Sequence, residues 1–206
     1  VDVVGSNSLG YDAEMLAVAY DIFKRLGFKF RIKVNNRKIL DSLLDELKVE
    51  NKEQVILEID KLDKIGDKEV IKNITKLTSN KIAKKIIKKI KSKNLKLKNN
   101  EGIEELNEVV KYLKLFGVKN VLIDYSLARG LSYYTGTVFE VFTDKKESIA
   151  GGGRYDNMIG KFIGKNEYPA TGISFGLEVI TDALKMAKKE SKKSVADVYI
   201  IPIGTT

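Results

Sequence analysis

The spacing of apolar residues changes twice along this chain, and that change restricts the folds it can adopt. Residues 28–34 alternate between apolar and basic side chains, which predicts a strand with one buried face in an antiparallel sheet. Residues 49–100 lack this alternation and contain only short helical patterns rich in Lys and Glu. Strand patterns return at residues 118–123 and 137–142. We therefore expect strands on both sides of a small helical insertion.

Four further segments have the 3.6-residue spacing of helices that bury one face. Asp12 is expected to cap the first of them, and Gly27 is expected to stop it. The last one follows a predicted strand and ends in a Lys-rich sequence. The expected helices cover residues 12–26, 37–47, 103–115 and 176–189.

The chain contains neither histidine nor cysteine, which limits the chemistry available to it. Thiolate nucleophiles, imidazole bases and imidazole metal ligands are therefore excluded. Catalysis would have to use carboxylates, hydroxyls, Lys, Arg or backbone amides. No apolar run reaches the roughly 18 residues that a membrane span needs, so we expect no membrane partner. Because the first residue is Val, we expect a fragment of a longer chain without a signal peptide.

The formal net charge of +9 favours a polyanionic partner such as RNA or a nucleotide. Lys outnumbers Arg by 32 to 5, however. An AT-rich genome or growth at high temperature would give the same excess of Lys without any polyanionic partner. Residues 79–98 hold nine Lys and no acidic residue. This stretch, which includes Lys81–Lys98, is either a solvated helix face or a surface that contacts a phosphate backbone.

Residues 127–140 form the most informative run of the chain. Arg129 stands between a strand and a glycine, where backbone can approach a ligand closely. A chain that otherwise uses Lys as its cation favours Arg where a planar, bidentate group is needed. Tyr133 and Tyr134 would point to opposite faces of an extended chain, so at most one is expected to line a pocket directly. Taken alone, the run is also compatible with a hairpin that carries surface aromatic residues.

Two glycine-rich runs follow. Residues 150–156 place three glycines before an arginine, which would let backbone approach a planar or phosphorylated group. Taken alone, a glycine-rich turn without chemistry is the better interpretation of this run. Residues 169–178 predict a strand with one bare face that leads into a helix N-terminus, an arrangement suited to a flat base and a phosphate. Tight packing of a helix on a sheet would explain this second run equally well.

In this order, the runs resemble the signatures of histidyl-tRNA synthetase, a class II aminoacyl-tRNA synthetase. Residues 129–140 and 152–156 are similar to the two histidine-specific signatures, and residues 172–178 to class II motif 3. Residues 2–5 are similar to the tail of motif 2. The resemblance covers essentially the whole chain, without motif 1 and most of motif 2. It implies an α+β fold of the class II synthetase type: an antiparallel sheet flanked by helices, with a helical insertion. The alternating strand at residues 28–34 agrees with this independently.

The resemblance also implies a domain organisation. The catalytic core would be divided by the insertion, and an α/β anticodon-binding domain would follow it. The family's enzymes are homodimers, but their dimer-forming motif 1 is missing here. The expected parts are the core at residues 1–48 and 102–190, the insertion at residues 49–101, and a linker with the first anticodon-domain strand at residues 191–206.

The activity that the resemblance implies has two steps, both in the cytoplasm. Histidine reacts with ATP, accompanied by Mg²⁺, to give histidyl-adenylate, and histidine then passes to the 3′ end of tRNA(His). Arg129 is the implied catalytic residue, in contact with the substrate carboxylate and the α-phosphate. The implied histidine-binding residues are Asp2, Arg129, Tyr133, Tyr134 and Tyr155. The implied ATP- and adenylate-binding residues are Gly152, Gly153, Arg154, Gly172, Gly176 and Glu178, with Glu178 also a candidate Mg²⁺ ligand.

Two residues depart from the family pattern. Ser132 stands where Asp is common, and Val179 stands where motif 3 has an Arg that holds ATP. Val179 therefore leaves two alternatives open: a synthetase-like regulatory subunit of histidine biosynthesis, and a catalytically inactive tRNA-binding module. Because motif 1 and the Arg-bearing part of motif 2 are absent, we expect these 206 residues to be inactive in adenylation by themselves.

Overall fold

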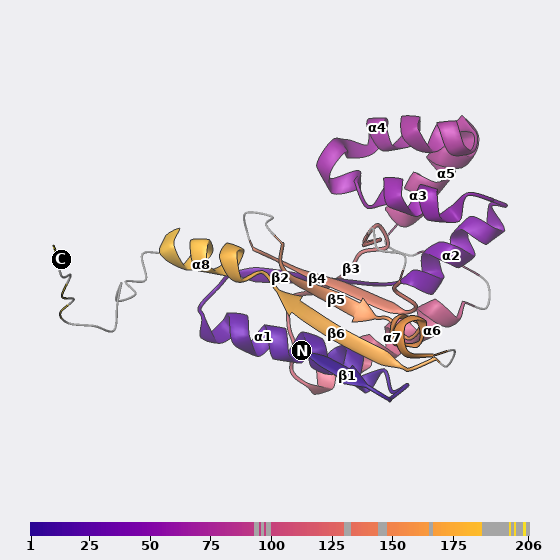
Figure 1. Cartoon of the computed structure of the whole chain (residues 1–206). Coiled ribbons are helices and arrows are strands. Elements are labelled where there is room, and N and C mark those ends of the chain that lie inside the picture. The colour runs from indigo at the N-terminus through magenta and orange to yellow at the C-terminus, as the bar shows by residue number, and fades with distance from the viewer. Residues whose placement is uncertain are drawn as a thin grey trace.

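The structure is a computed structural model. It describes residues 1–92, 95, 97, 100–129, 133–143, 148–164, 167–186, 198, 200 and 204. Within these residues it contains one six-stranded sheet and eight helices (Figure 1). The strands are β1 (Asp2–Val4), β2 (Phe30–Asn36), β3 (Val121–Ile123), β4 (Thr137–Thr143), β5 (Ser148–Arg154) and β6 (Ala170–Phe175). The helices are α1 (Gly10–Arg25), α2 (Arg37–Glu46), α3 (Lys52–Ile59), α4 (Leu62–Leu77), α5 (Asn80–Ile90), α6 (Glu101–Leu115), α7 (Met158–Ile163) and α8 (Leu177–Met186).

The strands lie in the order β1-β6-β5-β4-β2-β3. All neighbouring pairs are antiparallel except β2 and β3, which are parallel. The expected α+β class is confirmed, and the expected antiparallel sheet contains one parallel pair, at β3. Parallel strands need a long connection that returns the chain to the end of the sheet where the first strand began. The helical connection between β2 and β3 is long enough to do this.

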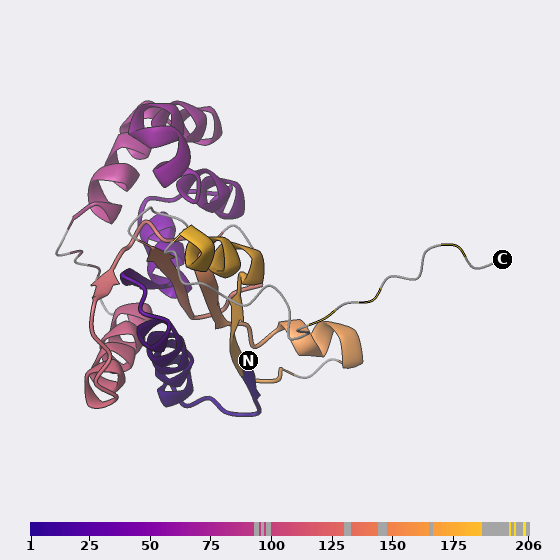
Figure 2. The same ribbon diagram turned by 90° about the vertical axis from the view of Figure 1, so that its left-hand side faces the viewer.

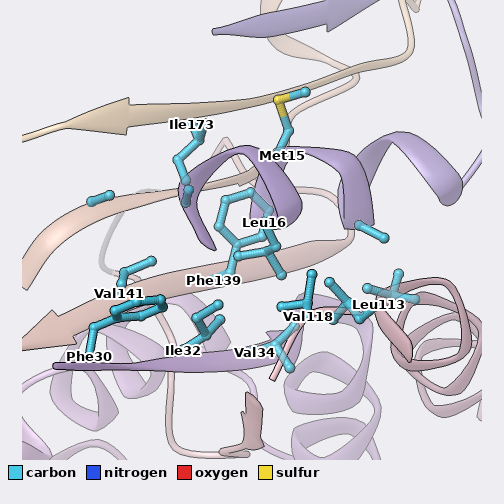
Figure 3. Close-up of a cluster of buried hydrophobic side chains, with 14 of the residues drawn as sticks. Met15, Leu16, Phe30, Ile32, Val34, Leu113, Val118, Phe139, Val141 and Ile173 are labelled. Carbon is cyan, nitrogen blue, oxygen red and sulfur yellow. The ribbon is translucent and has the colours of Figure 1, made fainter. Parts of the chain in front are cut away.

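One face of the sheet is covered by α1 and α6, and the main core lies there. Alternation along the strands directs every second side chain of β2 and β4 toward this core. Figure 3 shows Leu16 of α1 directed toward Phe139 of β4 and Ile32 of β2. These three side chains are fully buried. The opposite face of the sheet is therefore the one left for a binding site.

The helices α3, α4 and α5 form a helical lobe with its own apolar core, to which α2 also contributes. Figures 1 and 2 both show this lobe on the side of the sheet opposite α1. Helix α5 buries Ala83, Ile86, Ile87 and Ile90 and exposes its lysines, as an amphipathic helix should. The described part of residues 49–100 thus contains three helices, from Lys52 to Ile90, and no strand, as expected.

Several local expectations need correction. Helix α1 begins two residues before Asp12, so Asp12 lies inside its first turn, fully buried, and caps nothing. The glycine run, which taken alone favoured a turn, forms the central strand β5. Its glycines are explained by the neighbouring strands, whose backbones lie too close for larger side chains. The short elements β1 and α7 were not expected from the sequence. The anticodon-domain strand expected at residues 198–203 lies almost wholly outside the described residues.

None of the helices in the described ranges is both long enough and apolar enough to cross a membrane.

Candidate active site

The face of the sheet that turns away from α1 carries two rows of residues aligned across the strands. Side chains two positions apart on a strand share a face, and the register then aligns them from strand to strand. Both rows contain glycine on β5, so the sheet surface is bare there. The first row is Asn35, Val138, Gly153, Gly172 and Asp2, and the second is Lys33, Glu140, Gly151 and Ser174.

Each of three glycines in these rows lies directly beneath a predicted site residue. A Cβ at Gly151 would overlap the guanidinium of Arg129, and one at Gly172 would overlap the carboxylate of Asp2. A Cβ at Gly153 would stand 3.0 Å from Cδ1 of Tyr134. The three side chains therefore lie against bare backbone, on what we call the glycine floor (Gly151, Gly153 and Gly172). The structure thus brings together residues that are far apart in the sequence.

Arg129 is held in a constrained position at one side of the glycine floor. Its φ of 45° is left-handed, a conformation that costs a non-glycine residue about 1–3 kcal/mol and concentrates at functional sites. Its Nη1 lies 3.1 Å from Oε1 of Glu140 on β4. The Arg129 side chain is 23% exposed, so the guanidinium remains accessible to a ligand.

The three predicted tyrosines form one aromatic cluster. The ring centroids of Tyr133 and Tyr134 lie 4.5 Å apart, and those of Tyr133 and Tyr155 lie 6.5 Å apart with the rings edge to face. Tyr133 and Tyr134 precede β4 and do not belong to a strand, so the alternation expected of an extended chain does not apply to them. The Tyr155 hydroxyl donates a hydrogen bond of 2.6 Å to Oδ1 of Asp2. The cluster therefore connects the aromatic residues to the one carboxylate on the glycine floor.

Two of the three tyrosine hydroxyls have pKa values raised above their ordinary value. Burial and the neighbouring Tyr133 hydroxyl raise the pKa of Tyr134 to about 12. Burial and the hydrogen bond to the Asp2 carboxylate likewise raise the pKa of Tyr155 above its ordinary value. Both groups are therefore hydrogen-bond donors at neutral pH and not bases.

Arg154 does not join the cluster, because its guanidinium points into the protein. It is 5% exposed, and all five of its N–H donors have acceptors. Burial by itself would lower the pKa of Arg154, but the bonds and charges of Asp12 and Asp156 raise it. Asp12 also accepts a bond from the Thr171 hydroxyl. The acceptors are Asp12 Oδ2 (from Nε and Nη2), the carbonyls of Ser6 and Ser8, and Asp156 Oδ1.

The remaining predicted residues lie elsewhere on β5, β6 and α8. A Cβ at Gly152 would collide with the carbonyl oxygen of Gly172, so this glycine permits the close approach of β5 and β6. Gly176 and Glu178 lie beyond the far end of β6, where Gly176 donates its N–H to the Ile149 carbonyl. Glu178 is exposed, and no group of three metal-binding side chains occurs among the described residues. Val179 packs against the main core.

A cavity of about 680 Å³ adjoins Arg129 on the side away from the tyrosines. Its floor is the sheet, with Lys33 and Glu140, and its roof is the helical lobe, with Asp60 and Asp63. Lys33 Nζ lies 2.6 Å from Asp63 Oδ2 and 2.9 Å from Asp124 Oδ2, so one lysine joins the lobe to the segment before Arg129.

Several residues that support the site have no role that could be read from the sequence alone. Glu140 and Gly151 stood inside the informative runs, but only the strand register reveals that they hold and accommodate Arg129. Asn35 extends the series of polar residues Lys29, Arg31 and Lys33, so the sequence alone already placed its side chain on the same face of the strand as theirs. Asp12 was expected at a helix end, and its pairing with Arg154, 142 residues away, could not be inferred from the sequence alone.

Comparison with known proteins gives a consistent result. Residues 1–180 match a family model described as histidyl-tRNA synthetase. The chain is 40% identical over 224 residues to histidine–tRNA ligase 1 of Bacillus cereus, covering 100% of this chain and 52% of that protein. It is 38% identical to histidine–tRNA ligase of Clostridium tetani, covering 100% and 53%. The chain therefore spans about half the length of the curated relatives it matches.

A solved structure agrees with these relatives. The crystal structure of histidyl-tRNA synthetase from Nostoc sp. PCC 7120 superposes with a TM-score of 0.82 at 33% identity. The match covers 91% of this chain and 50% of that one. Sequence and fold therefore point to the same set of relatives.

Proposed function

The chain belongs to the histidyl-tRNA synthetase family, and from that premise we propose that the natural protein carrying it joins histidine to tRNA(His). In the first step, a carboxylate oxygen of histidine attacks the α-phosphorus of ATP, and pyrophosphate leaves. In the second, the 3′-terminal hydroxyl of the tRNA attacks the carbonyl of histidyl-adenylate, and AMP leaves. The observation that carries this proposal is the placement of Arg129, Tyr134 and Asp2 on one glycine floor.

Arg129 is proposed as the catalytic residue. A guanidinium can bridge the carboxylate and the α-phosphate, and it stabilises the negative charge that develops during in-line attack. Glu140, 3.1 Å away, fixes the orientation of the guanidinium, and the bare Gly151 lets it lie flat. Since the histidine carboxylate is already ionised, this step needs orientation and charge stabilisation rather than a side-chain base.

Asp2 and the tyrosines are proposed to bind histidine. The Asp2 carboxylate has the charge needed for the α-ammonium group, and Tyr155 orients it through their hydrogen bond. Tyr133 and Tyr134 supply aromatic surface for a flat imidazole ring. A hydroxyl kept protonated by burial, as in Tyr134 and Tyr155, rejects side chains that cannot pair with it.

The adenylate is proposed to lie along the bare backbone of β5 and β6. Gly153 and Gly172 let Tyr134 and Asp2 lie close to this backbone, Gly152 keeps the two strands close, and Gly176 precedes the N-terminus of α8. Arg154, which we predicted to contact ATP, is proposed instead to hold β5 against α1, since its donors are all engaged.

Mg²⁺ is proposed to arrive with ATP, because Mg²⁺ in such sites usually has one or two carboxylate ligands together with substrate phosphates. Glu178 is exposed and fits the role of that single carboxylate. When bound, the ion neutralises phosphate charge.

Gly151→Ala tests the glycine floor. The added methyl must displace the Arg129 guanidinium, so kcat for histidine activation should fall about tenfold or more while the fold persists. Histidine-dependent ATP–pyrophosphate exchange on the natural full-length protein measures this. Gly164→Ala is the matched control, because its methyl meets no atom within 4 Å. Equal activities of the two variants would contradict the proposed position of Arg129.

The helical lobe is proposed to bind the tRNA. Lys81, Lys84, Lys85 and Lys88 are exposed on one face of α5 and have no acidic partner among the described residues. Lys89 and Lys91, by contrast, pair with Glu46 and Asp67. A row of free ammonium groups attracts a phosphate backbone. The cavity beneath the lobe gives the 3′ end of such an RNA a route to Arg129.

Reversing these four charges should weaken tRNA binding. With Lys81, Lys84, Lys85 and Lys88 changed to Glu, KM for tRNA at low salt should rise about tenfold or more, without a change in KM for histidine. The control changes four lysines near α6 and β3 in the same way and so matches the net charge. If both variants raise KM for tRNA equally, the α5 lysines are only solvated surface. The control lysines are Lys29, Lys111, Lys114 and Lys119, all exposed.

Val179 is the observation that favours a regulatory subunit, because an Arg that holds ATP is missing. The proposed synthetase needs another cation to compensate for it. Transfer of radiolabelled histidine to tRNA by the natural full-length protein separates the candidates. A synthetase forms histidyl-tRNA, a tRNA-binding module only binds the RNA, and a regulatory subunit does neither.

The wider organisation is also a proposal. We assign residues 1–48 and 102–190 to a catalytic core, residues 49–101 to an insertion domain and residues 191–206 to the start of an anticodon-binding domain. The natural protein would act as a homodimer in the cytoplasm, where its tRNA substrate occurs. Sedimentation of the full-length protein tests the dimer.

A further inference from the structure

The segment from Asp124 to Arg129 has an unusual position between the sheet and the helical lobe. It follows β3 and ends in the left-handed Arg129. Tyr125 and Ala128 pack against the apolar core of the lobe. The main chain of this segment is joined to β2 by the Asp124 N–H, which donates to the Val34 carbonyl at 3.0 Å. Whatever fixes this segment also fixes the residue proposed for catalysis.

Asn35 of β2 makes two further connections to the segment. Its Nδ2 donates to the Leu127 carbonyl at 2.9 Å and to the Tyr125 carbonyl at 3.3 Å. Asn35 is completely buried, so these bonds are shielded from competition with water. They reach the main chain two and four residues before Arg129.

The carbonyl oxygen of the Asn35 side chain makes no such connection. This oxygen, Oδ1, is buried without a hydrogen-bond partner in the part of the chain that the structure describes. An unpaired buried oxygen is unfavourable, and an apolar side chain of similar size would avoid it. The two N–H donors are therefore the property that distinguishes asparagine from leucine at this position.

We propose that Asn35 is a positioning residue, which holds the carbonyls of Tyr125 and Leu127 so that Arg129 stays over Gly151. This inference rests on the proposed function only for its effect on catalysis. Asn35 touches no substrate in this account and acts through Arg129 alone. A displacement of about 1 Å in a group that contacts the reacting atoms can lower a rate up to a hundredfold.

Lys33 holds the same segment from the next position on this face of β2, through its ion pair with Asp124. Burial disfavours ionisation of Asp124, but hydrogen bonds from Ser126 and Lys33 outweigh it and keep the pKa of Asp124 below its ordinary value. Lys33 also binds Asp63 of the lobe, so its replacement would disturb two parts of the molecule. Asn35 gives the cleaner test.

The first measurement is amide hydrogen exchange in the natural full-length protein carrying Asn35→Leu. The amides of Asp124, Ser126 and Leu127 should exchange at least about tenfold faster than in the wild type. The control is Asn36→Leu, at an equally buried neighbour whose side chain binds Glu105 and caps α2 instead. Unchanged exchange in Asn35→Leu, or the same change in both variants, would overturn the inference.

The second measurement is kinetic. Asn35→Leu should lower kcat for histidine-dependent ATP–pyrophosphate exchange between about ten- and a hundredfold, per mole of folded protein, while Asn36→Leu leaves it unchanged. In an Arg129→Lys background, Asn35→Leu should cost less than about twofold, because its effect passes through Arg129. Costs that simply add would overturn the positioning role.

If the proposed function itself were wrong, the wild-type protein would give a different result from the one that overturns the role of Asn35. The wild-type protein would then show no exchange with histidine at all. The hydrogen-exchange result alone would decide whether Asn35 holds the segment that carries Arg129.

Discussion

Replacing Arg129 with lysine is expected to lower kcat for histidine-dependent ATP–pyrophosphate exchange about 10²- to 10³-fold, the usual cost of removing one donor from a developing negative charge. Lysine keeps the positive charge but cannot contact a carboxylate and a phosphate with two arms of one planar group. Lysine also lacks the planar group that pairs with Glu140 while lying over the bare Gly151. The measurement uses the natural full-length protein, with saturating ATP and histidine.

Arg31→Lys is the matched control for this substitution. Arg31 lines the same cavity as Arg129 but is exposed on β2 and is assigned no contact with substrate. Its replacement should leave exchange within about twofold of the wild type, because surface substitutions usually have small effects. If Arg129→Lys were as active as Arg31→Lys, the catalytic assignment of Arg129 would be wrong.

Replacing Arg154 with methionine is expected to destabilise the protein by about 3–5 kcal/mol, the cost of leaving one member of a buried ion pair without its partner. Asp12 is completely buried, and burial already raises the pKa of its carboxyl, so without Arg154 it must either take up a proton or remain an unpaired buried charge. The carbonyls of Ser6 and Ser8 would lose their donors as well. Thermal and urea unfolding of the natural full-length protein would show this as lower transition midpoints.

Two further variants identify the cause. Asp12→Leu combined with Arg154→Met should be less destabilising than Arg154→Met alone, because the completely buried carboxyl is then removed together with its partner. Arg25→Met removes an exposed ion pair with Asp21 on α1 and should change the midpoints little. A wild-type unfolding midpoint in Arg154→Met would contradict the view that Arg154 holds β5, β6 and α1 together.

Much of the fold follows from local periodicity. Strand β2 and helices α2 and α6 lie close to their predicted positions, because their apolar residues face one core with a regular period. The glycine run of β5 carries no such period. Its strand conformation depends on the backbones of β4 and β6, which only the folded sheet brings near. Parallel pairing of β3 is equally a property of the assembled sheet.

The candidate site could be predicted only in part, and for a similar reason. Arg129 and the tyrosines stand in recognisable runs, so their types and order were informative. The structure adds what lies beneath and beside them: Gly151, Glu140 and Asn35. Arg154 had the same sequence signal as Arg129, an arginine beside glycine. Only the burial of Asp12 reveals that its guanidinium faces the interior.

The proposed activity is tested most directly by ATP–pyrophosphate exchange in the natural full-length protein, measured with each of the common amino acids in turn. Exchange is expected with histidine alone, which would also mean that another cation compensates for Val179. If the protein bound histidine but catalysed no exchange, it would not be a synthetase, and Val179 would be the first residue to replace with arginine.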